Sequence, residues 1–213
     1  MSSKSGQFSS GFREELADLM QWRRDVRRFQ SAPLPTDLVE RCLSAFQYAP
    51  SVGLSEPWRI LRVESPTARN ACHANFRDCN AYALRGYAGE QAQLYSSLKL
   101  SGMTDAPLHL AVFCDEGSGK GANLGANTMP ETRAYSVVGA ITLFWLALRA
   151  EGVGLGWVSI LDPIRLAKDL DVPASWRFIG YLCIGWPEKE TIVPELEQAG
   201  WERRSTALKM DLR

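Results

Sequence analysis

The sequence predicts an α/β fold in a single domain, and three observations lead to this expectation. Helical and strand-like segments alternate along 213 residues, a length that suits one domain. The segment 131–151 is apolar on nearly all sides, which indicates a long helix buried at the centre of the protein or at a subunit interface. Apolar content of 46% and charged content of 23% are those of an ordinary globular protein.

The individual elements follow from apolar periodicity and from the positions of Gly, Pro and capping residues. Helices are expected at 12–22, 36–48, 66–100 (interrupted by Gly86 and Gly89), 131–151 and 162–170. Strands are expected at 58–63, 108–114, 152–160 and 176–186, with a long loop at 116–130. The remainder, 187–213, is a polar C-terminal extension with scattered apolar anchors.

Composition argues against several classes of protein. A formal net charge of zero disfavours a general nucleic-acid binder. Five cysteines without a CxxC motif and only two histidines disfavour a metal site and a disulfide framework. Residues 1–10 are polar, unlike a signal peptide, and the apolar run in 131–151 is shorter than the about 18 residues of a membrane span. We therefore expect a cytoplasmic protein that binds neither a metal nor a membrane, with a flexible N-terminus at 1–10 and one domain over 11–213.

A cluster of arginines stands at the end of the first expected helix. Four arginines occur within six residues, with one acid among them: Arg23, Arg24, Asp25, Arg27 and Arg28. Guanidinium groups are planar, permanently charged donors that suit a phosphate. A solvated charge cluster at a helix end is the alternative. Since the chain as a whole is neutral, we interpret the cluster as a local anion site.

The glycine series Gly152-Val153-Gly154-Leu155-Gly156 does not predict a dinucleotide site. The Rossmann fingerprint needs a strand, then glycines, then a helix, whereas here a helix precedes the glycines and a strand follows. These glycines either let another flat group approach the backbone closely or form a tight turn. The residues alone leave both readings open.

Taken together, residues 22–201 resemble the nitroreductase-like flavoprotein superfamily. Members begin with an Arg-Arg-Ser-x-Arg-x-Phe motif that holds the phosphate and ribityl chain of FMN. The matching residues here are Arg23, Arg24, Asp25, Arg27 and Phe29. The departure is Asp25, where an ordinary nitroreductase has Ser.

With Asp25 at this position, the sequence resembles one branch of the superfamily, the aerobic 5,6-dimethylbenzimidazole synthases of cobalamin biosynthesis. Further matches to this branch lie at 49–53 (APSVG), 97–100 (SLKL) and 149–160 (RAEGVGLGWVSI). The resemblance implies an oxidoreductase that uses dioxygen to fragment reduced FMN, taken as substrate, to 5,6-dimethylbenzimidazole and erythrose 4-phosphate. It also implies a nitroreductase-like α+β fold, with a mixed, mostly antiparallel sheet covered by helices.

The resemblance also implies which residues form the site. Residues matching Asp25 and Ser159 are the catalytic pair of the branch, although a strand-end serine bonded to backbone is the alternative for Ser159. A carboxylate beside the flavin can serve as the base that breaking the ribityl chain requires. We expect the neighbouring arginines to hold the pKa of Asp25 low. The expected FMN contacts are Arg23, Arg24, Asp25, Val26, Arg27, Ser51, Gly53, Leu100 and Ser159.

Partners are implied in the same way. Family members are homodimers with flavin sites at the interface, and in this branch a lid covers the flavin, here at about 80–94. The absence of a nucleotide fingerprint predicts a separate flavin reductase that supplies reduced FMN. Two alternatives stay open: a conventional FMN-dependent NAD(P)H nitroreductase or flavin oxidoreductase, which Arg28 and Phe29 resemble, and a non-catalytic flavin-binding protein.

Overall fold

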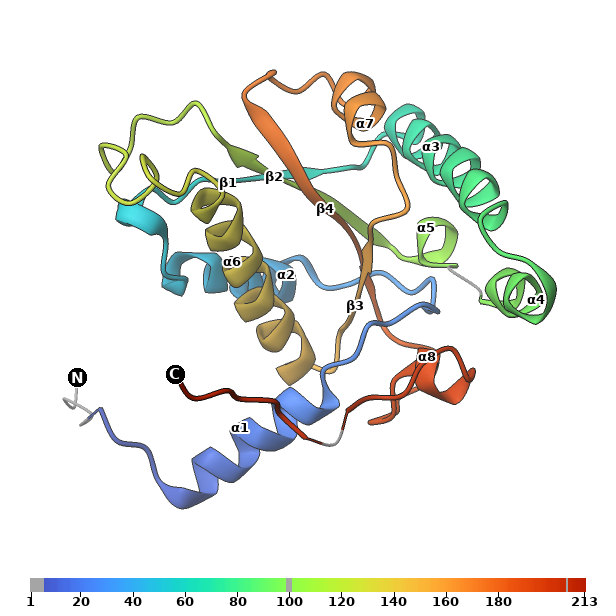
Figure 1. The fold of residues 1–213 in the computed structure, drawn as a ribbon, viewed down its shortest axis with the longest axis horizontal. Coiled ribbons are helices and arrows are strands. Elements are labelled where there is room, and N and C mark those ends of the chain that lie inside the picture. Colours follow the sequence, from blue (N-terminus) through green and yellow to red (C-terminus); the bar gives the residue numbers. More distant parts are fainter. Residues whose placement is uncertain (1–5, 99–100, 206) are drawn as a thin grey trace.

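The computed structural model describes residues 6–98, 101–205 and 207–213, and it has the expected α/β architecture (Figure 1). The α-helices are α1 (Ser10–Trp22), α2 (Thr36–Leu43), α3 (Pro66–Leu84), α4 (Gly89–Ser97), α5 (Gly102–Asp105), α6 (Thr132–Ala150), α7 (Pro163–Asp169) and α8 (Glu195–Gln198). Two 3₁₀ helices are η1 (Ser44–Tyr48) and η2 (Val52–Leu54). The strands are β1 (Trp58–Arg62), β2 (Leu108–Asp115), β3 (Gly154–Val158) and β4 (Trp176–Gly185).

The expected elements are present, with three differences. The helix expected at 36–48 is α2 followed directly by η1. The helix expected at 66–100 is divided into α3 and α4, and Gly89 begins α4 with a φ of 56°, which favours glycine. Helices α5 and α8 were not predicted, because four residues each are too few to show a helical period.

The four strands form one sheet in the order β1-β2-β4-β3, and every neighbouring pair is antiparallel. The parallel component of this mixed sheet is an isolated bridge between Asp25 and Leu155 of β3. The segment after α1 therefore runs beside β3 at the edge of the sheet. This pairing places the arginine cluster next to the strand that leads to Ser159.

Helices cover both faces of the sheet (Figure 1). Helices α2 and α6 pack on one face, in a core that includes Leu110, Phe144 and Leu182. Helices α3 and α7 lie on the other face, over a core that includes Phe113 and Tyr181. Full burial of each such side chain contributes roughly 1.5–3 kcal/mol to the stability of the fold. The helices packed on both faces therefore hold the sheet, and with it the edge strand β3, in a fixed place.

Helix α6 is central, but the expected burial holds for one side of it only. Eight of its residues are buried, whereas Tyr135 is 60% exposed, Val138 is 41% exposed and Thr142 is also exposed. Because residues three and four apart share a helix face, these three form an outward stripe. The sheet can cover only the opposite side of the helix, so the stripe is open to a further partner.

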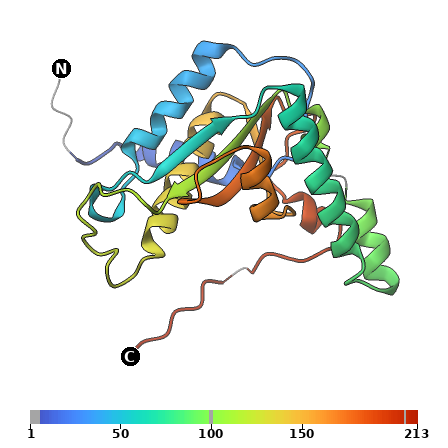
Figure 2. The ribbon, with the colours of Figure 1, turned by 90° about the horizontal axis from the view of Figure 1, so that it is seen from above.

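The C-terminal residues 207–213 leave the body of the molecule as an extended chain (Figure 2). None of the helices within the described residues is long and apolar enough to cross a membrane.

Candidate active site

The arginine cluster is held against β3 by backbone pairing. After α1 ends, the N–H of Val26 donates to the carbonyl oxygen of Leu155 at 3.0 Å, next to the bridge between Asp25 and Leu155. The segment is therefore an added edge strand, and its side chains have fixed directions.

The glycines of β3 make this pairing possible. A Cβ on Gly154 would lie 2.8 Å from Cγ2 of Val26, and a Cβ on Gly156 would lie 2.2 Å from the carbonyl oxygen of Val26. Both distances are shorter than real side chains tolerate. Gly154 and Gly156 therefore admit the side chain and the backbone of Val26, whereas Gly152, with a φ of 78°, lies in the turn between α6 and β3, so both readings of the glycine series hold at different positions.

The carboxylate of Asp25 has two partners. Its Oδ1 accepts the backbone N–H of Trp157 at 2.8 Å, and its Oδ2 lies 3.6 Å from Nε of Arg27. The side chain is 43% exposed, yet protein atoms surround it, and this desolvation raises its pKa. The N–H of Trp157 and the charges of Arg27 and Arg23 oppose the rise without cancelling it. The prediction that the arginines hold the pKa low is therefore wrong, because the loss of water outweighs them.

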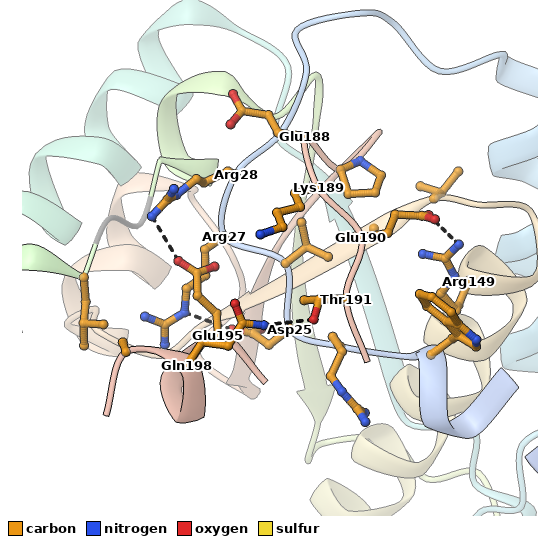
Figure 3. Close-up of a pocket in the computed structure, with 18 of the residues that line it drawn as sticks. Asp25, Arg27, Arg28, Arg149, Glu188, Lys189, Glu190, Thr191, Glu195 and Gln198 are labelled. Carbon is orange, nitrogen blue, oxygen red and sulfur yellow. Dashed lines mark hydrogen bonds and ion pairs between the residues drawn. The ribbon is translucent and has the colours of Figure 1, made fainter. Parts of the chain in front are cut away.

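A cavity of about 480 Å³ opens beside this segment (Figure 3). Four of the predicted residues line it, namely Arg24, Asp25, Val26 and Arg27. The C-terminal end of α6 and the segment 187–199 form the other walls. The volume is within the range of sites for small ligands and cofactors.

The far wall adds charged residues that the sequence did not identify. Arg28 pairs with Glu195 at 3.2 Å, and Arg149 pairs with Glu190 at 2.6 Å (Figure 3). Lys189 also lines the cavity, and within the described ranges it forms no ion pair or hydrogen bond. Arg28 is a member of the arginine cluster itself, whereas the other residues belong to α6 and the C-terminal extension, and only the tertiary fold brings them to the cluster.

A second group of guanidinium ions surrounds the start of the segment. Arg23 lies over the ring of Trp145, 4.6 Å from its centroid, and Nε of Arg24 donates to the carbonyl oxygen of Ile192 at 2.6 Å. The pKa of each arginine is lowered, first by burial and then by the charge of Arg204. Arg204 of the C-terminal extension was not predicted, and it adds positive charge to a place that suits a phosphate.

Ser159 lies just beyond the end of β3. Its side chain is exposed and forms no hydrogen bond within the described part of the chain, so the reading as a serine satisfied by backbone does not hold. It follows Trp157, whose N–H holds Asp25, by two residues in the chain. It does not line the cavity. Leu100 lies outside the described residues.

Ser51 and Gly53 are not brought to the cavity within one chain. Oγ of Ser51 accepts the N–H of Glu56 at 3.1 Å, and a Cβ on Gly53 would lie 2.9 Å from a carbonyl oxygen of the 116–130 loop. The adjoining η2 is bonded to Ser136 near the start of α6, whereas the cavity contacts Arg149 near its end. At roughly 1.5 Å per residue, these two positions are about 20 Å apart along the helix.

In the part of the chain that the structure describes, no group of three or more His, Cys, Asp or Glu side chains is placed to hold a metal ion. The five cysteines are free thiols, and two of them, Cys114 and Cys183, are fully buried in the core.

Comparison with known proteins identifies the class to which this fold and site belong. Residues 20–186 match the model of the Nitroreductase family. The chain belongs to the nitroreductase family, and it is an enzyme.

Within the family, the chain is similar to curated enzymes named 5,6-dimethylbenzimidazole synthase. It is 51% identical to that of Rhodospirillum rubrum over 197 residues, which cover 92% of this chain and 93% of the relative. It is 44% identical to that of Rhodobacter capsulatus over 195 residues, covering 92% and 94%. The resemblance to this branch is thereby confirmed.

A solved structure of iodotyrosine deiodinase bound to FMN and 3-iodo-L-tyrosine has a similar fold. The TM-score is 0.72 at 21% identity, over 93% of this chain and all of that chain. This likeness confirms the nitroreductase-like α+β fold.

Proposed function

We propose that the protein catalyses the oxygen-dependent fragmentation of reduced FMN to 5,6-dimethylbenzimidazole and erythrose 4-phosphate, which supplies the lower ligand of cobalamin. The observation that carries this proposal is the placement of Asp25. Its carboxylate is fixed by the N–H of Trp157 in a cavity rich in arginine, where an ordinary family member has a serine. The names of the two bacterial relatives support the same reaction.

The arginines would hold the phosphate of FMN. The charge of Arg204 lowers the pKa of both Arg23 and Arg24, so a dianion bound beside these arginines would relieve the repulsion among them. Hydrogen bonds from guanidinium to phosphate are among the stronger ones in proteins. The ammonium of Lys189, which has no ion pair or hydrogen bond within the described residues, adds a further donor in the cavity.

Asp25 would act as the base. Reduced FMN supplies both the electrons that reduce dioxygen and the carbon skeleton of the benzimidazole. The raised pKa makes the Asp25 carboxylate a stronger base than an exposed aspartate, while the N–H of Trp157 and the charge of Arg27 favour its ionised form. The free hydroxyl of Ser159 can both donate and accept a hydrogen bond, which suits the second residue of the pair.

A second copy of the chain would complete the site. Ser51 and Gly53 lie about 20 Å along α6 from the cavity, so one chain cannot join the two groups of predicted contacts. The outward stripe of α6, with Tyr135 and Val138, is an apolar surface that a homodimer would bury. The lid would be α4 with the end of α3, where Tyr87 and Tyr95 pack on Trp201 of the C-terminal extension.

Reduced FMN would come from a separate reductase, and the reaction would take place in the cytoplasm, which suits five free thiols.

A conventional nitroreductase is the alternative function. The match of Phe29 to ordinary nitroreductases supports this alternative only weakly, because Phe29 is a core residue with 2% exposure and has a packing role. Asp25 has no purpose in that alternative.

The test is to mix the protein with excess FMN, a flavin reductase, NADPH and air, and to analyse the products by chromatography. We expect 5,6-dimethylbenzimidazole in this mixture and none when the reductase is omitted. Formation of product from NADPH, FMN and the protein alone would contradict the need for a separate reductase. Nicotinamide oxidation stimulated by nitroaromatics, without benzimidazole, would favour the conventional nitroreductase.

A further inference from the structure

Two tryptophans stand between two charged groups of the site. The backbone N–H of Trp157 in β3 holds the carboxylate of Asp25 at 2.8 Å. The guanidinium of Arg23 lies over the ring of Trp145 in α6, 4.6 Å from the ring centroid. The rings of Trp145 and Trp157 are neighbours, with centroids 6.5 Å apart and planes tilted by 43°. The proposed base and one proposed phosphate contact are therefore joined through one aromatic pair.

The indole of Trp157 occupies a place that only a glycine leaves free. Gly180 is buried in β4, and a Cβ on it would lie 2.6 Å from Cε2 and 2.9 Å from Cζ2 of the indole, and closer still to Nε1. Real Cβ atoms essentially never approach another heavy atom below 3.0 Å. Because the indole is a rigid plane, a side chain at Gly180 would require the whole ring to move.

The sheet explains why these two residues meet. Trp157 is paired with Leu182 across β3 and β4, so Gly180, two residues before Leu182, is its diagonal neighbour on the same face. The register between β2 and β4 shifts directly beside the pair of Val112 and Gly180, and this shift leaves Ile179 without a partner in β2. A glycine within a strand often marks such a bulge or the close approach of another group.

We propose that Gly180 is a positioning residue of this site, because its missing side chain seats the indole of Trp157. The seated residue holds the carboxylate of Asp25 through its backbone N–H. Its ring supports Trp145, which in turn supports Arg23. This inference rests on the proposed function for the roles of the base and of the phosphate contact. Gly180 itself is not among the described residues that line the cavity, so it acts through the indole pair.

Displacement of the indole has a predictable electrostatic result at the base. Desolvation and the charge of Glu195 raise the pKa of Asp25, whereas the N–H of Trp157 and the charges of Arg27 and Arg23 lower it. A shifted Trp157 would weaken its hydrogen bond to the carboxylate and would loosen the support of Arg23. Both changes raise the pKa of Asp25 further.

The test adds a methyl group at Gly180 and then removes the ring that it would meet. Gly180→Ala is compared with Gly180→Ala/Trp157→Leu, which keeps the backbone N–H without the indole. Ala111→Val is the control for overpacking, because Ala111 is fully buried in the same sheet and belongs to the core of the opposite face. ¹³C NMR of the carboxylate gives the pKa of Asp25 in the flavin-free protein. Flavin fluorescence gives the affinities for FMN and riboflavin.

Gly180→Ala should raise the pKa of Asp25 and weaken FMN binding about tenfold more than riboflavin binding, the order of a lost cation–π contact. Its benzimidazole formation should fall about 10²-fold, as a displacement of about 1 Å can cause. The double variant should regain the wild-type pKa of Asp25 but not the FMN affinity, since Trp145 stays unsupported. Ala111→Val should change none of these properties.

Several results would overturn the inference. Gly180→Ala with the wild-type pKa of Asp25 and the wild-type ratio of FMN to riboflavin affinity would do so, and so would equal changes in Ala111→Val. If Gly180→Ala does not fold, the double variant decides, because it should fold and regain the pKa of Asp25 only if the indole is the group that Gly180 accommodates. If the wild type makes no benzimidazole, the proposed function fails, whereas the pKa and the affinity ratio still test the role of Gly180.

Discussion

Asp25 is placed where its charge is unfavourable for folding and useful for catalysis. Desolvation raises its pKa despite one backbone N–H and two nearby guanidinium ions. An acid with a raised pKa in the folded state stabilises the fold fully below its unfolded pKa, about 3.9, and this stability is lost as pH rises through the folded pKa. The sequence identified the residue, but the arginines beside it suggested the opposite pKa shift, because desolvation of this half-exposed carboxylate by surrounding protein atoms is a tertiary property.

Asp25→Asn should therefore raise the melting temperature at pH 7, and the difference from wild type should shrink as pH falls toward 4. The amide oxygen can still accept the N–H of Trp157, so the geometry is kept. Asp37→Asn is the control, since the surface pair with Arg41 lowers the pKa of Asp37 and this substitution should have the opposite sign. Thermal unfolding followed by circular dichroism across this pH range gives the answer. A lower melting temperature for Asp25→Asn at pH 7 would contradict the assigned shift.

Arg204 should contribute to affinity for the phosphate. Because a hydrogen bond to a charged group contributes about 1.5–3 kcal/mol, Arg204→Ala should weaken FMN binding by one to two decades. Riboflavin, which lacks the phosphate, should bind the variant and the wild type equally. Arg203→Ala is the matched control, and flavin fluorescence measures all the affinities. Equal losses for FMN and riboflavin would remove Arg204 from the phosphate site.

At the scale of elements, the segment 23–28 after α1, here called the edge segment, and strand β3 act as one unit. The sequence left two readings of the glycines before and within β3 open, a close neighbour or a tight turn. It could not identify that neighbour, because Val26 and Gly156 are far apart in sequence and are joined only by strand pairing. The same pairing places Asp25 on the N–H of Trp157.

Gly156→Ala should displace the edge segment. Its new Cβ would meet the carbonyl oxygen of Val26 at 2.2 Å, and overpacking of this kind typically costs about 1–3 kcal/mol. We expect a melting temperature lower by several degrees and a loss of FMN binding, measured by calorimetry. Gly11→Ala in α1, where a Cβ meets nothing within 4 Å, should do neither. A Gly156→Ala protein with unchanged FMN affinity would show that the pairing does not position the site.

At the scale of the whole molecule, the predicted contacts fall into two groups. Arg24, Asp25 and Arg27 line the cavity, whereas Ser51 is bonded to Glu56 and Gly53 lies against the 116–130 loop. Short motifs identified both groups from the sequence, but the distance between them appears only in the fold. The helices and strands were predictable from periodicity, while the far wall at 187–199 was not, because its polar sequence has no period.

Val138→Glu in the outward stripe of α6 should prevent dimer formation and abolish FMN binding. A carboxylate buried without a partner in an apolar interface is strongly unfavourable. Ile164→Glu on α7, where the side chain is 82% exposed, is the same kind of change on the other face of the sheet and should leave both properties intact. Light scattering and flavin titration test the pair. A Val138→Glu monomer that binds FMN normally would show that one chain holds a complete site.

The most direct test of the central claim is benzimidazole formation by Asp25→Asn. Reduced FMN is bound to the wild type and to the variant, air is admitted, and product is measured by chromatography while reoxidation is followed by absorbance. Since loss of a general base typically costs about 10²–10⁴-fold, the variant should reoxidise bound flavin and yield almost no 5,6-dimethylbenzimidazole. Formation of benzimidazole by Asp25→Asn at a near wild-type rate would contradict the account, because Asp25 would then be a structural residue.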